Sequence, residues 1–510
     1  MGYEKPANIE AMVQFSTFFL ERSTPDRVEV VCRNNNPLGE NQTMAYMKQE
    51  QYDIYSHLFQ DPLQKNHELL LLAERIDWDD ITDRLLPYYS KRGRRPKKIR
   101  LMVGLHILKH RFDLSDEEVV QGLHENVYWM GLCGVKLQPR WKHGAEAQSC
   151  RFLDSSTMTK FRRRLGAEGF REMEDAIREI LICKKQLSAK SQIVDTTAQP
   201  KHIEYPTDTE LLHRGRDRLV HTIRRLHAHG VKGIEGIRSF SRLSRKVIIG
   251  IHKLGKDRKG RIEAGLRKLS GYAQEVVKRV PEVIEHTEEK IRNLYAKGAP
   301  KAAGAMERLK EKLESESKLV KRVIHQAQER LRGIHVPNKV YSLHEPHVAC
   351  IRKGKRATPN EYGSKVLISV DRHGYVVDHQ EYASNPHDSE LLEEACERWE
   401  HIFQTPAKEL ATDRGFHHKE EAAAPHVAHI EKVAIPTKGK TLHPHKETSW
   451  FKRLQKQRAK IEPVIGHLKA DHGMDRCRYK GFEGDQINVT LATISWNLKK
   501  WGKHLVAQAT

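Results

Sequence analysis

The feature of this 510-residue chain that most constrains its fold is a change of sequence period that occurs twice. A short β-branched run, Ser191 to Thr197, is followed by a long helical pattern over residues 208–335, and strand-like runs begin again at Lys339. β-branched residues favour strands, whereas apolar residues spaced three and four apart favour helices. Helices are then interleaved with the later strands and trail after them. The sequence therefore predicts an α/β core that is interrupted by an all-helical insertion.

The elements of this core and insertion can be placed by their periods and turn residues. Strands are expected at Val340–Leu343, Val348–Ile351, Lys365–Val370, Tyr375–Val377, Glu409–Asp413 and Val433–Ile435, with a turn at Asp371–Gly374. Helices are expected at 168–182, 389–403, 450–472 and 487–504. We expect the helices of the insertion to be interrupted near Gly230, Gly260, Pro281 and Ala299-Pro300. Their arrangement fits an antiparallel coiled pair.

The charge of the chain indicates a polyanionic partner. Its net charge is +22, and residues 208–335 alone hold 31 Lys+Arg against 16 Asp+Glu, whereas residues 1–90 hold 8 against 15. A single charged helix is about as often a solvated face. An imbalance across a whole segment instead favours a surface that binds the phosphates of nucleic acid.

Several classes of protein are excluded. No stretch approaches the ~18 apolar residues of a membrane span, and the start of the chain lacks the basic region of a secretory signal. The seven cysteines are scattered, odd in number and never spaced as Cys-x-x-Cys. We therefore expect a cytosolic protein without membrane contact, disulfides or a zinc knuckle.

The N-terminal half reads as helical after a loosely ordered leader, residues 1–48. A basic linker, Lys91–Lys98, contains Arg94 and Arg95 and is either a phosphate contact or a solvated hinge. A helix from Ile99 to His110 precedes Ser115, which with Glu118 forms a capping box for the next helix. This pattern suits a helix-turn-helix that reads DNA, but any αα-hairpin looks the same.

A further capped helix is expected from Ser155-Ser156-Thr157-Met158. It carries a basic cluster, and side chains of this kind at the start of a helix suit phosphate contacts. The cluster consists of Lys160, Arg162, Arg163 and Arg164.

Three carboxylates stand where phosphodiester chemistry would need them. Such chemistry uses two divalent cations about 4 Å apart, one at the attacking and one at the leaving oxygen, and hard oxygen ligands suit Mg²⁺. Asp195 and Asp413 each follow a short strand, at the end of which a side chain projects over the sheet. Glu462 lies on a C-terminal helix.

Helical spacing at ~100° per residue would place Arg458, Glu462 and Lys469 on one helix face. A carboxylate flanked by two cations can bind a metal while its neighbours hold a phosphate. Pro463 weakens this geometry, because a proline inside a helix removes a hydrogen bond and bends the axis. An ordinary surface ion pair between Arg458 and Glu462 explains the same spacing.

Three other groups of residues contain potential metal ligands. His344-Glu345 follows an expected strand and belongs either to the site or to a turn ordered by Pro346. Asp371 and Asp378 suit a hairpin better than a metal site. None of the histidine pairs, such as His417-His418, has the ligand spacing of a zinc site.

The order of these motifs resembles that of bacterial insertion-sequence transposases of the DDE type, in the branch related to the insertion-sequence-five group. The matching segments are Ile193–Thr197 with Tyr205–Asp208, Ser342–Pro346 with Lys353-Gly354-Lys355, Thr412–Phe416, and Arg458 with Glu462 and Lys469. In the N-terminal half, Gly93–Pro96, Leu114–Glu118 and Ser156–Arg162 resemble the DNA-binding region of that family. The resemblance covers about residues 51 to 500.

The resemblance implies a ribonuclease-H-like catalytic core, with an N-terminal all-α DNA-binding region and the helical insertion. The expected domains are the leader 1–48, the DNA-binding region 49–185, the core 186–207 with 336–510, and the insertion 208–335. Asp195, Asp413 and Glu462 would form the DDE triad. Related transposases carry a signature of Tyr, Arg, Glu and Lys. The last three match Arg458, Glu462 and Lys469, but Gln455 replaces the tyrosine.

The roles implied by the resemblance follow from the same chemistry. Asp195 would bridge two Mg²⁺ ions, with Mn²⁺ as a substitute, while Asp413 and Glu462 would each hold one. Arg458 and Lys469 would position phosphate, and Arg94, Arg95, Lys160, Arg162 and Arg163 would contact DNA. No covalent protein–DNA intermediate is required.

The leading hypothesis is thus a cytoplasmic, nucleoid-associated transposase that binds the terminal inverted repeats of its element as double-stranded DNA, at least as a homodimer, and cleaves and joins strands. A non-catalytic regulator or architectural protein derived from a transposase is the main alternative, and a metal-dependent nuclease without strand transfer is a third.

Overall fold

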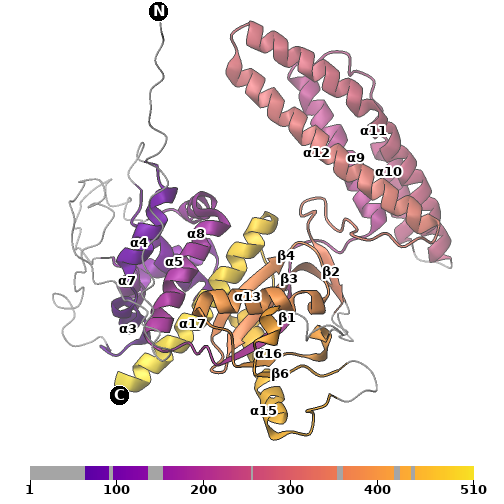
Figure 1. Ribbon diagram of the computed structural model, residues 1–510. Helices are drawn as coiled ribbons and strands as arrows, with labels where there is room; N and C mark the ends of the chain where they lie inside the picture. Colours follow the sequence, from indigo (N-terminus) through magenta and orange to yellow (C-terminus); the bar gives the residue numbers. More distant parts are fainter. Residues whose placement is uncertain are drawn as a thin grey trace, which may run out of the picture. The chain divides into compact units, whose positions relative to one another are not determined.

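The computed structural model describes residues 64–90, 96–135, 153–253, 257–352, 360–417, 425–437 and 443–509 (Figure 1). The expected leader and the linker arginines Arg94 and Arg95 lie outside these ranges. None of the helices within them is long and apolar enough to cross a membrane. The five cysteines that they include are free thiols.

A mixed sheet forms the centre of the α/β part. Its described strands are β1 (Ser191–Pro200), β2 (Ala349–Arg352), β3 (Asn360–Asp371), β4 (Val376–Tyr382), β5 (Glu409–Ala411) and β6 (Lys432–Ala434). The order is β2-β3-β1-β5-β6, and β4 also pairs with β3. β3 runs antiparallel to β1, β2 and β4, while β5 is parallel to β1 and to β6. On one side β1 therefore has an antiparallel neighbour, β3, and on the other side it has a parallel neighbour, β5.

Strand β1 is buried on both faces of the sheet. Ile193 joins an apolar cluster with α15 (Ser449–Arg458), α16 (Ile461–Asp471) and α17 (Gly481–Ala509), and Val194 joins another with α13 (Leu392–Phe403). Successive side chains of a strand point to opposite faces, so these helices cover the two sides of the sheet (Figure 1). The covered sheet explains why the run Gln192–Val194 is apolar or amide throughout.

Two expectations for this core are wrong. Residues 340–343 are not a strand, because the backbone N–H and C=O of Val340 are bonded to the side chain of Gln326 instead of to a neighbouring strand. The expected helix 450–472 is two helices, α15 and α16, separated at Ala459-Lys460. Pro463 then falls in the first turn of α16, where a missing N–H costs little.

The other expected elements of the core are present with shifted ends. The expected strand at 348–351 is β2, the one at 365–370 is the longer β3, and the helix at 487–504 is part of α17. The carboxylate of Asp371 accepts hydrogen bonds from the N–H groups of His373 and Tyr375 in the β3–β4 turn, which confirms its hairpin role. The expected helix at 389–403 consists of the 3₁₀ turn η3 (Asp388–Glu390) and α13. A short helix α14 (Pro425–Ala428) precedes β6.

The N-terminal helices share one core with the C-terminal helix α17. They are α3 (Glu68–Arg75), α4 (Trp78–Leu85), the turn η1 (Leu86–Tyr88), α5 (Ile99–Arg111), α6 (Asp116–Glu125), α7 (Val127–Leu132) and α8 (Ser156–Cys183). The capping box of Ser115 and Glu118 is present at α6. At α8 the side chain of Asp154, not of Ser155, accepts the hydrogen bond from Ser156. Gly166, at φ +61°, lets α8 change direction at that residue.

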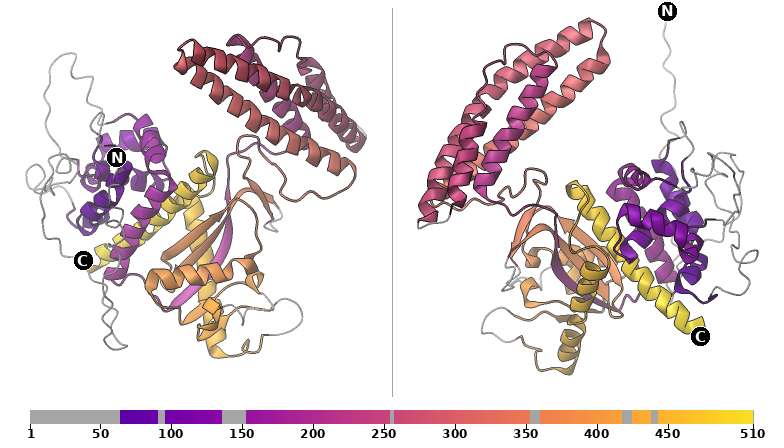
Figure 2. Two further views of the ribbon diagram at one scale, coloured as in Figure 1. Left: turned by 45° about the horizontal axis from the view of Figure 1, so that its top comes forward. Right: turned by 180° about the vertical axis from the view of Figure 1, so that it is seen from behind.

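The insertion is a group of four described helices with its own apolar core. They are α9 (Asp208–Ala228), α10 (Ser241–His252), α11 (Arg258–Ala296) and α12 (Pro300–Leu331), and α9, α11 and α12 run side by side in both views of Figure 2. The breaks near Gly230 and at Ala299-Pro300 are confirmed. The break expected near Gly260 lies a few residues earlier, between the end of α10 at His252 and the start of α11 at Arg258. The break expected at Pro281 is wrong, because α11 continues through this residue.

Candidate active site beside β1 and β5

Asp195 lies in the middle of β1 and Asp413 lies just beyond β5, at the same level along these neighbouring parallel strands. The expectation that a strand ends at Asp195 is wrong, because β1 pairs with β3 as far as Pro200. The pairing of β1 with β5 ends at Ile193 opposite Ala411, so each aspartate lies two residues beyond that pair. Asp195 is 14% exposed, and its Oδ1 accepts a hydrogen bond from the N–H of Thr196 at 2.7 Å. The carboxylate of Asp413 accepts one from the N–H of Gly415 at 2.8 Å, in the 3₁₀ turn η4 (Arg414–Phe416). The sheet therefore brings together two carboxylates that are 218 positions apart in sequence.

Glu462 is connected to Asp195 through one arginine. Arg458 is the last residue of α15, and Glu462 lies in the first turn of α16. The guanidinium of Arg458 lies 3.2 Å from Asp195 Oδ2 and 2.8 Å from Glu462 Oε1. The expected single-helix stripe is thus wrong in its geometry, because two helices supply it. The surface ion pair between Arg458 and Glu462 is present, and Arg458 also reaches Asp195.

Gln455 has a structural role at the position where related transposases carry tyrosine. Its side-chain amide donates to the backbone carbonyls of Thr412, at 3.2 Å, and Ala434, at 2.6 Å. These carbonyls lie at the ends of β5 and β6. Gln455 therefore fixes helix α15 to the strand end from which Asp413 projects.

Lys469, the last member of the expected stripe, faces strand β3. Its ammonium lies 3.4 Å from a carboxylate oxygen of Glu361. Glu361 pairs with Ile351 across β2 and β3. Lys469 thus connects α16 to the neighbouring hairpin.

A fourth carboxylate, Asp388, belongs to the same region and was missed by the sequence analysis. It lies on η3, accepts a hydrogen bond from the hydroxyl of Thr196 at 2.8 Å, and pairs with the ammonium of Lys365 at 2.6 Å. A Cβ atom on Gly415 would lie 2.9 Å from carboxylate oxygens of both Asp388 and Asp413. The signal was available, because Asp388 follows strand β4 in a polar turn just as Asp413 follows strand β5.

The donor set suits a hard divalent cation. Its ligands would be carboxylate oxygens, which Mg²⁺ and Mn²⁺ prefer, and the guanidinium of Arg458 shows that positive charge is stabilised between Asp195 and Glu462. Within the described ranges, however, no group of three or more His, Cys, Asp or Glu side chains is close enough to hold a metal ion. Glu462 is held by Arg458 and is 63% exposed.

The basic cluster of α8 is divided between the surface and the interior. Lys160 and Arg163 are exposed. Arg162 is buried, its guanidinium lies 2.5 Å from the carboxylate of Asp116, and it stacks on the ring of Tyr479. The expectation that Arg162 contacts phosphate is therefore wrong, because its charge is already neutralised inside the protein.

The helix pair expected to read DNA has little basic surface. Helix α5 is buried along nearly its whole length. The exposed residues of α6 are Glu117, Glu118, Gln121 and Glu125. Because acidic side chains repel phosphates, α6 is poorly suited to lie in a DNA groove.

Glu345, which the sequence assigns either to the catalytic site or to a turn, lies in a different charged cluster. Its carboxylate accepts a hydrogen bond from the N–H of Gly481 and faces the ammonium of Lys201, which pairs with Asp485 at 2.6 Å. These groups are buried. Glu345 therefore holds α17 against the end of β1.

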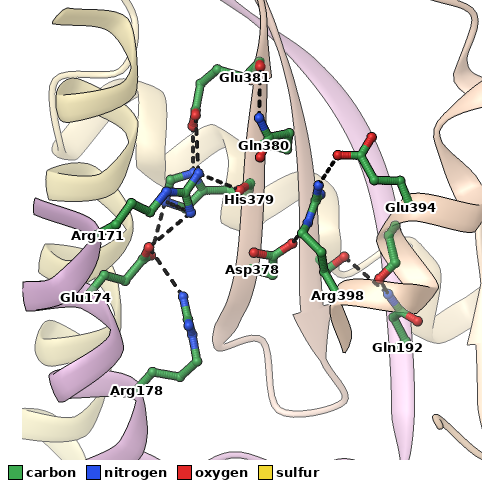
Figure 3. Close-up of polar contacts among 12 residues, drawn as sticks. Arg171, Glu174, Arg178, Gln192, Asp378, His379, Gln380, Glu381, Glu394 and Arg398 are labelled. Atoms are coloured by element: carbon green, nitrogen blue, oxygen red, sulfur yellow. Dashed lines mark hydrogen bonds and ion pairs between the residues drawn. The ribbon is translucent and has the colours of Figure 1, made fainter. Parts of the chain in front are cut away.

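A second charged cluster lies between α8 and β4 (Figure 3). The imidazole of His379 lies 3.1 Å from Glu174 and 2.6 Å from Glu381, and Arg171 contacts both carboxylates at 3.3 Å. Burial and Arg171 oppose the charge of His379, but Glu174 and Glu381 outweigh them and raise its pKa. Burial opposes the charge of Glu174, yet His379 and Arg178 bring its pKa well below the ordinary value.

Comparison with known proteins agrees with this geometry. Residues 57–164 match the family described as Transposase domain (DUF772), and residues 340–498 match the family described as Transposase DDE domain. The second match includes Asp413 and Glu462. The chain belongs to the insertion-sequence transposases of the DDE type.

The transposase also has a relative of unassigned function. This is the "Uncharacterized protein ORF8 in nfe locus" of Rhizobium meliloti, which is 35% identical over 200 residues, or 39% of this chain and 89% of the relative. No solved structure matches the chain. The DDE domain implies a ribonuclease-H-like core, with which the mixed sheet agrees, and its family generally uses divalent metal ions and acts on DNA.

Proposed function

We propose that this transposase binds the terminal inverted repeats of its own insertion sequence and catalyses metal-dependent DNA cleavage and strand transfer. The observation that carries the proposal is the placement of Asp195 and Asp413 at the same level, each two residues beyond the last pair of β1 with β5, with Glu462 connected to Asp195 through Arg458. Three acidic residues from separate elements are the donor set that two-metal phosphodiester chemistry requires.

Asp195, Asp413 and Glu462 would hold the divalent cations, Mg²⁺ in the first place. When bound, the cations supply Lewis-acid stabilisation at the attacking and leaving oxygens. Arg458 would release Glu462 and bind the scissile phosphate instead. Its positive charge would then neutralise the negative charge that develops on the phosphate. Lys469 would assist from α16, and no side chain is needed as a general base.

The DNA would be held by basic residues outside the catalytic region. Lys160 and Arg163 are exposed near the start of α8, the linker arginines Arg94 and Arg95 precede α5 in sequence, and the insertion carries most of the positive excess. Arg162 is not among these residues, because it is buried. Joining two element ends requires them to be brought together, so we propose a homodimer as the active assembly.

The test is cleavage of a plasmid that carries the sequences flanking the gene. Full-length protein, Glu462→Gln and the control Glu447→Gln, an exposed carboxylate on the preceding segment, are compared with Mg²⁺ and with Mn²⁺. We expect cuts at the repeat ends with the parent and the control, and at least 1,000-fold slower cleavage with Glu462→Gln, while end binding persists. Specific end binding with no cleavage by any of the three proteins would favour the regulator instead.

A further inference from the structure

A cleft begins beside the proposed catalytic carboxylates and ends at the root of the insertion. It has a volume of about 770 Å³. Thr196, Lys365 and Asp388 line one end, and Tyr341 and Arg352 line the other. Because Asp388 flanks Gly415 together with Asp413, the cleft opens onto the carboxylate region.

The lining of the cleft is strongly cationic. Arg322, Lys339, Arg352 and Lys365 contribute four basic side chains, and three histidines line it as well. Its one carboxylate, Asp388, is already paired with Lys365. This imbalance suits a ligand with several negative charges.

Aromatic rings extend from the far end of the cleft. Tyr341 lines the cleft, its ring centroid lies 5.3 Å from that of Tyr362, and Tyr205 lies edge-on to Tyr362 at 6.0 Å. Tyr205, Tyr341 and Tyr362 form the tyrosine cluster. Tyr205 is 76% exposed, although an aromatic side chain gains most by burial. Exposed aromatics beside basic side chains are the combination that binds unpaired nucleotides, since bases stack on the rings while cations follow the backbone.

The size of the cleft suits a few unpaired nucleotides, because its volume is in the range of small-molecule sites rather than of a duplex. Thr196, which lines the cleft, pairs with Leu367, and Pro200 pairs with Gly363, the residue after Tyr362. At about 3.3 Å per residue, the tyrosine cluster therefore begins about 13 Å along β1 from Thr196. A short unpaired strand can bridge that distance.

We propose that this cleft binds an unpaired single-stranded segment of the DNA substrate, with bases stacked on the tyrosine cluster and phosphates paired with Arg352, Lys339 and Arg322. The inference deepens the proposed function and rests on it for the identity of the substrate. The strand would run from the carboxylate region towards the insertion, so that the nucleotides next to the scissile phosphate are melted out of the duplex and held. The site is distinct from Lys160 and Arg163, which would contact paired DNA.

The test measures binding of full-length protein to a fluorescein-labelled 15-nucleotide oligo-dT and to a 20-base-pair duplex by fluorescence anisotropy at fixed salt. We expect Tyr205→Ala to weaken oligo-dT binding about tenfold and to change duplex binding less than twofold. Tyr205→Phe keeps the ring and should bind oligo-dT like the parent. The control Tyr295→Ala removes a tyrosine that is 49% exposed on α11 and should change neither.

The basic side of the cleft has a matched pair of its own. Arg352→Ala should weaken oligo-dT binding about fivefold, whereas Arg332→Ala, an exposed arginine at the end of the insertion, should leave it unchanged. Equal losses for oligo-dT and duplex would overturn the proposal in favour of a general duplex surface, and unchanged oligo-dT binding by Tyr205→Ala would overturn it outright.

This experiment separates the cleft from the catalytic proposal. Glu447→Gln, the control for plasmid cleavage, should bind oligo-dT as the parent does, because Glu447 is exposed and does not line the cleft. Selective loss of oligo-dT binding in Tyr205→Ala supports the cleft even where plasmid cleavage fails. If Tyr205→Ala cleaves at the repeat ends and also binds oligo-dT like the parent, the catalytic proposal is supported and the cleft proposal is contradicted.

Discussion

Two charged clusters on the same sheet differ in how their charge is balanced. Between α8 and β4, Glu174 and Glu381 face Arg171, Arg178 and His379 in the interior, so each carboxylate has protein cations around it. Beside β1 and β5, Asp195 and Glu462 share Arg458, Asp388 pairs with Lys365, and Asp413 accepts a hydrogen bond from the N–H of Gly415. A balanced, enclosed cluster holds the protein together. An acid-rich cluster that reaches solvent is suited to bind a cation from outside.

The largest effect on stability should come from the enclosed cluster. Glu174→Ala leaves His379 and Arg178 buried without that partner and removes the acceptor of Thr493. We expect the free energy of unfolding to fall by about 3–5 kcal/mol, measured by urea denaturation. Glu462→Ala, at the exposed end, should cost less than about 0.5 kcal/mol. Equal losses in the two variants would remove the distinction between the clusters.

Gln455→Ala should affect both stability and catalysis. It removes the donor to the carbonyls of Thr412 and Ala434, and we expect a loss of about 1–3 kcal/mol. Cleavage should fall further than the lost stability explains, because Asp413 follows Thr412 directly. Lys456→Ala on the exposed side of the same helix is the control for both measurements. Unaltered cleavage by a destabilised Gln455→Ala would show that Gln455 does not position Asp413.

The enclosed cluster should also give stability a recognisable pH dependence. The folded-state pKa of His379 is raised above its unfolded-state value near 6.5. Its contribution is therefore complete below about pH 6.5 and is lost as the pH rises through the folded-state pKa, by at most about 1.4 kcal/mol per pH unit. The free energy of unfolding that His379→Gln removes should thus be larger at pH 6 than at pH 9. A difference that grows with pH would contradict the charged state of His379.

Histidines in the helical part should respond in the opposite direction. Burial lowers the pKa of His106 and of His110 to about 3 and that of His472 to about 4. These side chains stay neutral when folded, so their unfolded forms bind more protons below pH 6.5 and stability falls as the pH is lowered. In His379→Gln the loss of stability at low pH should remain, whereas the loss of stability at high pH should disappear.

A small change in stability is expected for Gly415→Ala. The new Cβ would meet carboxylate oxygens of Asp388 and Asp413, which can turn aside, so unfolding should change by about 1 kcal/mol or less. Cleavage should still fall at least tenfold, because both carboxylates are displaced. The control is Gly466→Ala on α16, where the structure leaves space for the methyl group. Cleavage at the parent's rate in Gly415→Ala would exclude this turn from the site.

Patterns local in sequence predicted the fold better than the site. The capping box of Ser115 and the strand carrying Asp195 depend on a few adjacent residues, and both are present. The burial of Arg162 depends on Asp116, 46 residues away, and the place of Asp388 beside Gly415 depends on the folding of the sheet. No spacing rule reveals such contacts. Residues 340–343 do not form a strand, because the side chain of Gln326 takes the backbone hydrogen bonds of Val340.

The joining of the two ends of the insertion has a consequence for how the chain can fold. Asp208, at the start of α9, is bound by Gln326 and Arg330 near the end of α12, and Gln326 also bonds the backbone of Val340. The cost of loop closure grows with the length of free chain between paired segments. Once α9 and α12 have associated, β1 and β3 are separated by a short effective loop rather than by the whole insertion. An insertion that folds first in this way can change its length without delaying the assembly of the sheet.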